Sequence, residues 1–229
     1  MVDVYKIAVW AKSREESLEE QVNRAYRILN KLKEYKLFDV LLLPAESKEK
    51  VKEFELSKEN IKELILNKQD KQFPDIGTTL LFFTSLVDGE STSIIISVGI
   101  YSNRLKNTMT ISLPVNFTSS QLIGCIGLLK DLFQVYEASY AFFTSNMNLE
   151  LYDKWYDNDN KIPKVVFWVN YWGNDMVNKL KVDDKLLEAV YEYEITKDGC
   201  YVRTQKEPID VLNQKHIELQ KKLNRLLEL

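Results

Sequence analysis

Apolar residues follow a strand-like and then a helical spacing in the first third of the chain. Residues 5–10 alternate loosely between apolar and polar side chains, which predicts a strand. Apolar residues then recur every three or four positions, which predicts a long helix that ends near residue 34. Ser13 and Glu16 have the spacing of a capping box, so we expect this helix to begin directly after Ser13. A second, more polar helix is predicted over 58–68.

Seven further segments have strand-like patterns. Two pairs of them flank Asp88-Gly89 and Asp198-Gly199, and an Asp-Gly pair between two strands is typical of a hairpin turn. Pro114 ends the third segment, because proline cannot donate to a strand ladder. The predicted strands cover 78–85, 91–100, 107–113, 138–144, 164–171, 190–195 and 200–204.

Two more helices complete the predicted elements. Thr118 and Gln121 form a second capping box before an apolar run that extends to Phe133. This run is apolar on most faces, so we expect it to be the central buried helix, and a final amphipathic helix is predicted over 213–227. The strands come in adjacent runs that helices interrupt. This order favours an α+β fold in which several helices pack on a mostly antiparallel sheet, as a single domain over 1–229.

The charge balance argues against a nucleic-acid-binding protein. The 229 residues include 31 Lys and Arg against 34 Asp and Glu, a net charge of -3. A surface that grips phosphates would be basic and rich in arginine, so we expect no direct nucleic-acid contact. No apolar run approaches the roughly 18 residues of a membrane span, and the first residues do not resemble a signal peptide. We therefore expect a cytoplasmic protein that has no membrane contact and keeps its cysteines reduced.

Few residues in the chain have the pattern of a catalytic or metal site. The single histidine, His216, has no acidic residue or cysteine at ligand spacing, so we expect a local role near a helix end. Cys125 lies in the most apolar helix and Cys200 in a hairpin, and neither position activates a thiol. The stretch from Asp157 to Lys161 lacks the glycine and glutamate of a calcium loop. We predict no cofactor, no metal ion, no catalytic residue and no enzyme activity.

One segment, residues 148–160, combines acids with large aromatic residues. Its acids outnumber its one lysine, Lys154, so that it carries a net charge of -3 and the rest of the chain sums to zero. Tyrosine and tryptophan dominate interface hot spots, and a local acidic surface steers a basic partner. The alternative is a short connecting helix whose rings pack inward while its acids stay solvated. The candidate contact residues are Glu150, Tyr152, Asp153, Trp155, Tyr156, Asp157 and Asp159.

Several short motifs follow one another along nearly the whole chain. They are Trp10 with Arg14-Glu15-Glu16, Val98-Gly99, 107–114 with its final proline, Pro163 before Trp168 to Tyr171, and Gly199 to Thr204 followed by Asp210 and Asn213. The order of these motifs resembles the immunity protein 52 family of bacterial polymorphic-toxin systems. The chain departs from the family pattern at Phe167, where glycine is common, and at Val98, where cysteine is common.

This resemblance implies a small protein that binds and neutralises a toxin encoded beside it, usually a nuclease of the restriction-endonuclease type. Such inhibition needs a pre-organised surface and no chemistry of its own. Because nuclease toxins tend to be basic, the segment 148–160 is the expected contact, and the small net charge favours local plugging or exosite binding over DNA mimicry. The motif residues are expected to be structural anchors: Trp10, Arg14, Glu16, Gly99, Trp168, Tyr171 and Gly199.

Two other functions stay open from the sequence. Any two of the 34 acids could converge as a catalytic carboxylate pair, and the chain could be a scaffold subunit of another bacterial assembly. The sequence leaves open which toxin is bound, whether its active site is covered and whether the chain forms oligomers.

Overall fold

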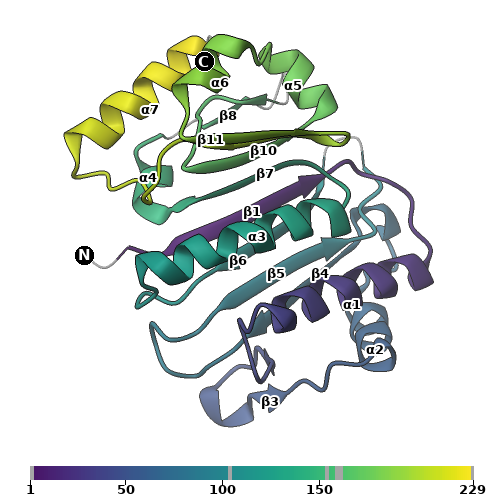
Figure 1. Ribbon diagram of the computed structural model, residues 1–229. Helices are drawn as coiled ribbons and strands as arrows, with labels where there is room; N and C mark the ends of the chain where they lie inside the picture. Colours follow the sequence, from purple (N-terminus) through teal and green to yellow (C-terminus); the bar gives the residue numbers. More distant parts are fainter. Residues whose placement is uncertain (1–2, 103–104, 153–154, 158–161, 228–229) are drawn as a thin grey trace.

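A ten-stranded antiparallel sheet runs through the computed structural model, which describes residues 3–102, 105–152, 155–157 and 162–227 (Figure 1). The strands are β1 (Tyr5–Ala11), β2 (Leu42–Leu43), β3 (Lys52–Glu53), β4 (Thr78–Phe83), β5 (Ser93–Val98), β6 (Asn107–Ser112), β7 (Ala138–Ser145), β10 (Val169–Gly173), β11 (Glu192–Thr196) and β12 (Gly199–Arg203). Their order is β11-β12-β10-β7-β1-β6-β5-β4-β2-β3. A separate small pair joins β8 (Tyr156–Asp157) to β9 (Ile162–Pro163).

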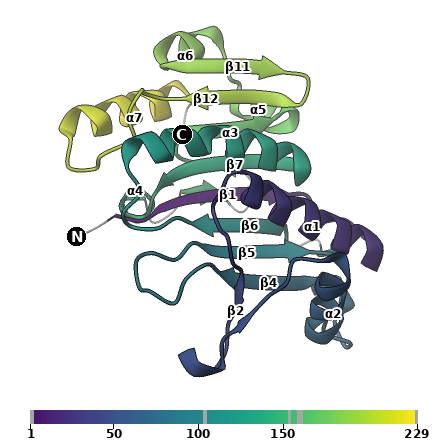
Figure 2. The same ribbon diagram turned by 60° about the horizontal axis from the view of Figure 1, so that its bottom comes forward.

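Helices cover both faces of this sheet, and each face has its own hydrophobic core. The helices are α1 (Leu18–Glu34), α2 (Lys58–Lys68), α3 (Ser119–Val135), α4 (Asn146–Glu150), α5 (Asn174–Leu180), α6 (Asp184–Ala189) and α7 (Gln214–Leu226), with two 3-10 turns at Lys48–Lys50 and Pro74–Ile76. The first core joins the sheet to α1, α2 and α3, and the second joins it to α5, α6 and α7 (Figures 1 and 2). Within the described residues, no helix is long and apolar enough to cross a membrane.

The central strand β1 supplies both cores through the alternation of its side chains. Ile7 and Val9 are fully buried in the first core, whereas Ala8 lies in the second core beside Phe142. Neighbouring residues of a strand point to opposite faces, so one strand can serve two helical layers. β1 pairs with β6 on one side and with β7 on the other.

The second face of the sheet is covered over only part of its width. On β4, β5 and β6, every second residue is buried under α1 and α2, while most side chains on the other face remain accessible, with Ser97 the buried exception. Thr79 and Ile95 are exposed, and Thr108 and Thr110 are partly exposed. This alternation is typical of an antiparallel sheet with one solvated face.

The α+β fold and most long elements are confirmed. The structure contains the predicted first strand, both predicted hairpins, the capping box at Thr118 and the final helix. α3 is the central buried helix, as its composition predicted.

The predicted capping box at Ser13 is wrong. α1 begins at Leu18, with Ser17 as its N-cap and Glu20 completing the box. The Glu16 carboxylate does not turn back to Ser13, because it accepts a hydrogen bond from the distant Gly99 backbone N–H (2.9 Å). A long-range partner therefore moves the helix start by about one turn.

The predicted strand 164–171 is also misplaced. The strand β10 begins at Val169 and continues to Gly173. Phe167 lies before the strand, and its backbone N–H and C=O are both hydrogen-bonded to the side chain of Asn170 within the strand. The short helices α4, α5 and α6 were not predicted, since elements of five to seven residues are too short to show a helical period.

Gly199 is required where β12 approaches β10. It has φ +154, and a Cβ at this position would lie 2.1 Å from the Trp172 carbonyl oxygen. We expect Gly199→Ala to lower the free energy of unfolding by about 1–3 kcal/mol, because the backbone must shift. Gly124→Ala is the matched control: nothing lies within 4 Å of its Cβ in α3, so it should stabilise by about 0.5–1 kcal/mol. Urea denaturation measures both, and equal midpoints for the two variants would contradict this account.

Candidate functional site

The aromatic residues of the predicted contact segment pack against the second face of the sheet. The Trp155 ring stacks on Trp10, with centroids 5.0 Å apart and an interplanar angle of 27°. Trp155 also makes edge contacts with Phe142 (5.0 Å) and Phe167 (5.8 Å). Tyr156 meets Trp10 edge-on at 4.4 Å. These rings attach the segment to the fold, and both Trp155 and Tyr156 keep part of their surface accessible.

A lysine lies against the same aromatic cluster. The Lys106 ammonium lies 4.6 Å from the centroid of the Tyr156 ring and 5.5 Å from that of Trp10, and it donates a hydrogen bond to the Tyr156 hydroxyl. Burial, with a smaller contribution from the Asp157 carboxylate, raises the pKa of Tyr156 to about 12. The hydroxyl therefore stays protonated at neutral pH, and the cation interacts with the rings through their π faces.

The remaining predicted contact residues differ in their exposure. Of the predicted contact residues that the structure describes, only Glu150 is exposed, and it accepts a hydrogen bond from Asn146. Asp157 keeps only 17% of its side chain accessible and pairs with Lys164 at 3.4 Å. Tyr152 is half-buried and donates to Gln220 (3.2 Å). Two further predicted contacts, Asp153 and Asp159, lie outside the described residues.

Glu16 is the centre of a buried polar cluster that unites several motif residues. Its carboxylate is only 3% exposed. It accepts from Arg24 Nε at 2.7 Å, from Arg14 Nε at 3.3 Å and from the Gly99 backbone N–H at 2.9 Å. The cluster therefore joins the segment after β1, the helix α1 and the end of β5.

The same cluster continues to the end of α3. Arg24 donates to the Tyr136 carbonyl at 2.8 Å, and Tyr136 donates its hydroxyl to the Ser97 carbonyl at 2.5 Å. Glu137, which has φ +52, forms ion pairs with Arg14 and with Arg24. Arg14 and Glu16, two of the motif residues, are thus paired within a larger arrangement that the sequence did not indicate.

The other motif residues lie in or beside the core. Trp168 is fully buried and donates its indole N–H to the Gln205 carbonyl at 3.1 Å. Tyr171 stacks on Phe133 with centroids 3.7 Å apart. Trp10 is partly exposed and packs as described above. These environments fit structural anchors, which is the role expected for these residues.

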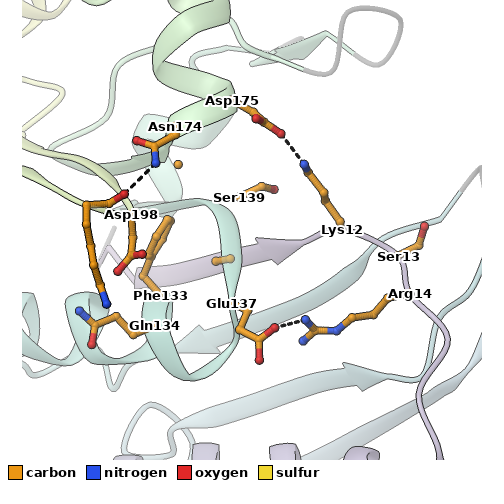
Figure 3. A pocket seen from close by; sticks show the side chains of 13 residues that line it. Lys12, Ser13, Arg14, Phe133, Gln134, Glu137, Ser139, Asn174, Asp175 and Asp198 are labelled. Atoms are coloured by element: carbon orange, nitrogen blue, oxygen red, sulfur yellow. Dashed lines mark hydrogen bonds and ion pairs between the residues drawn. The ribbon is translucent and has the colours of Figure 1, made fainter.

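A cleft of about 860 Å³ opens at one end of the sheet, where β1 and β10 end and β7 begins (Figure 3). Three basic and three acidic residues line it, and the pairs Lys12–Asp175 and Arg14–Glu137 bridge neighbouring parts of its wall. The cleft therefore has a balanced charge, with two of its acids already bound to cations.

The thiols and the histidine have structural environments. Burial raises the pKa of Cys125 and of Cys200 to about 11, so little thiolate is present at neutral pH. His216 accepts from the Asp210 N–H at 3.0 Å and bonds Asn213 at 3.2 Å, which is the expected local role at the start of α7. Within the described ranges, no group of three or more His, Cys, Asp or Glu residues could hold a metal ion.

An acidic stretch around β11 was missed in the sequence. Residues 183–198 contain six acids and two lysines, a net charge of -4, which exceeds that of 148–160. In β11, Glu192 and Glu194 alternate with Tyr193 and Ile195, and all four are exposed. A count of charges in a sliding window would have found this stretch, but only the strand order shows that it lies at the edge of the sheet.

The fold of this chain is similar to that of solved structures. No family model and no curated protein matches the chain, so the resemblance to the immunity protein 52 family stays a prediction. Among solved structures, the Pseudomonas aeruginosa T6SS protein PA0821 is similar with a TM-score of 0.64 at 10% identity; the match covers 99% of this chain and 72% of that one. At this identity, the similarity shows the fold alone.

The Glu16 cluster can be tested by removing its acceptor. We expect Glu16→Ala to lower the free energy of unfolding by about 3–5 kcal/mol, because the buried Arg24 would lose its close carboxylate and keep only the more distant one of Glu137 at 3.8 Å. Glu19→Ala, an exposed acid in the first turn of the same helix, should cost less than about 1 kcal/mol. Thermal and urea unfolding of both variants measure the difference. Similar losses would show that the Glu16 pairs add little to stability.

Proposed function

We propose that this protein is an immunity protein, which binds a cognate bacterial polymorphic toxin and neutralises it by stoichiometric protein–protein inhibition. The toxin is a nuclease with a basic surface. The observation that carries this proposal is the similarity of the fold, over 99% of the chain, to a T6SS protein of Pseudomonas aeruginosa. The order of motifs that resembles the immunity protein 52 family supports it from the sequence side.

An inhibitor of this kind acts through its surface alone. It needs about 1,600 Å² of buried area and a few anchoring side chains, and it needs no reactive group. The thiols and the histidine fit this requirement, since each has a structural role in the fold.

The segment 148–160 is the proposed contact with the basic toxin. Its net charge of -3 favours the approach of a cationic surface, and the accessible parts of Trp155 and Tyr156 can pack on it. The solvated face of β4, β5 and β6 gives the chain further surface that no helix covers in the described structure. The proposed mode is local plugging or exosite binding, in which the toxin's own active site keeps its structure.

Co-expression with the nuclease domain of the neighbouring toxin gene tests the proposal. We expect the chain to restore growth of cells that express this domain, and to elute with it as one complex from a sizing column. A nuclease that is active alone but is neither neutralised nor bound would contradict the pairing. An inactive nuclease domain serves as the control, because it should still bind the chain.

Glu150→Lys tests the proposed contact without disturbing the core. Glu150 is exposed, so reversal of its charge should weaken toxin binding about three- to ten-fold, mainly through slower association at low salt. The matched control is Glu63→Lys on the exposed side of α2, which should bind as the unchanged protein does. Trp155→Ala is a poorer test, because it also removes packing against Trp10. If both lysine variants bind the toxin with equal affinity, the segment 148–160 is not the contact surface, and the proposed immunity function is unaffected.

A further inference from the structure

The strand β11 forms one edge of the ten-stranded sheet, and its side chains are unusually accessible for a sheet. Tyr193 is 50% exposed and Ile195 is 69% exposed. An edge strand directs the N–H and C=O groups of alternate residues away from the sheet, where another strand can bind them. β11 therefore combines free main-chain groups with two exposed apolar side chains.

The opposite edge of the sheet lacks these properties. It is formed by β3, which has only the two charged residues Lys52 and Glu53. Short, charged edge strands are a common protection against unwanted pairing. β11 is longer, at five residues, and one of its faces is apolar.

The charge around β11 selects the kind of strand that can pair with it. Glu192 and Glu194 lie on the face opposite Tyr193 and Ile195, and their side chains are 46% and 55% exposed. Each has one cation, Arg203 at 3.5 Å and Lys130 at 2.7 Å, and a carboxylate can accept further hydrogen bonds. Because residues 183–198 have a net charge of -4, an added basic strand would meet an attractive field.

A second copy of this chain is a poor occupant of the edge. Antiparallel pairing centred on Glu194 places that residue opposite its own copy, and pairing centred on Tyr193 places Glu192 opposite Glu194. Pairing centred on Ile195 places Glu192 opposite Asp198. Like charges directly opposite each other destabilise a strand pair, so every one of these registers carries a penalty.

We propose that β11 is a docking edge, at which an extended segment of the partner protein adds an eleventh strand to the sheet. In this segment, Lys or Arg alternates with aliphatic residues. The basic side chains lie beside Glu192 and Glu194, the aliphatic ones beside Tyr193 and Ile195, and main-chain hydrogen bonds supply the register. The identity of the partner, a basic toxin, rests on the proposed function. The chemistry of the docking segment is inferred from β11 alone.

A synthetic peptide tests this docking edge without the toxin. The probe is an acetylated and amidated ten-residue peptide in which lysine and valine alternate, titrated into the full chain while backbone amide shifts are followed. We expect the largest shifts in β11 and β12. Ile195→Ser should weaken binding about ten-fold, and the double variant Glu192→Gln/Glu194→Gln by a similar factor. Leu212→Ser is the matched control, because Leu212 is an aliphatic residue that is 84% exposed elsewhere, and it should leave the affinity unchanged.

Three results would overturn the proposal. Equal binding of a peptide whose alternate amides are N-methylated would exclude strand addition, since such a peptide cannot form the ladder. Equal binding of a glutamate–valine peptide would exclude the charge selection. A concentration-dependent dimer of the chain that Ile195→Ser abolishes would make a second copy the occupant.

The toxin complex separates this proposal from the proposed function. If the toxin binds Ile195→Ser and Leu212→Ser equally well, the docking edge is overturned and the immunity function stands. If the peptide binds at β11 but the toxin does not bind the chain, the edge is a strand-docking site and the immunity function is overturned.

Discussion

The buried carboxylate of Glu16 determines how the first half of the molecule is arranged. A carboxylate that is 3% exposed is stable only when cations and hydrogen-bond donors surround it, and here Arg24, Arg14 and the Gly99 N–H do so. These donors come from different parts of the chain, with Gly99 83 residues away. The contact therefore fixes the segment between β1 and α1 against the end of β5, and through Arg24 it positions the end of α3.

The contacts of Glu16 also illustrate which parts of the fold the sequence predicts and which it does not. The long helices α1 and α3 follow from periodicity, because each buries a regular set of side chains against the sheet, and the hairpin β11–β12 follows from its Asp-Gly turn. Ser13 and Glu16 have the right local spacing for a cap, but local spacing cannot show that Glu16 has a stronger partner far along the chain. Ser17 and Glu20, with the same spacing, form the cap instead. The short helices α4 to α6 depend on packing against the second face and leave no periodic signal.

The segment 148–160 and the strand β11 show that the sequence is also a limited guide to binding sites. The composition of 148–160 suggests an interface, yet its rings contribute to the fold through Trp10 and Phe142 and only part of their surface is accessible. The alternation in β11 indicates a strand equally well whether that strand is central or at an edge. Its exposure becomes visible only with the strand order, in which β11 has a single neighbour. Pairing order is a long-range property, so it is the part of a binding site that a single sequence reveals least.

The central position of β1 has a consequence for synthesis of the protein. β1 leaves the ribosome before both of its neighbours, because β6 and β7 begin only at Asn107 and Ala138. At roughly 5–20 residues per second, β1 waits on the order of 5–25 s for its two partner strands. During that interval its apolar residues Ile7 and Val9 have no sheet to join. The nascent chain is therefore most vulnerable to aggregation and to chaperone capture before β7 has been translated.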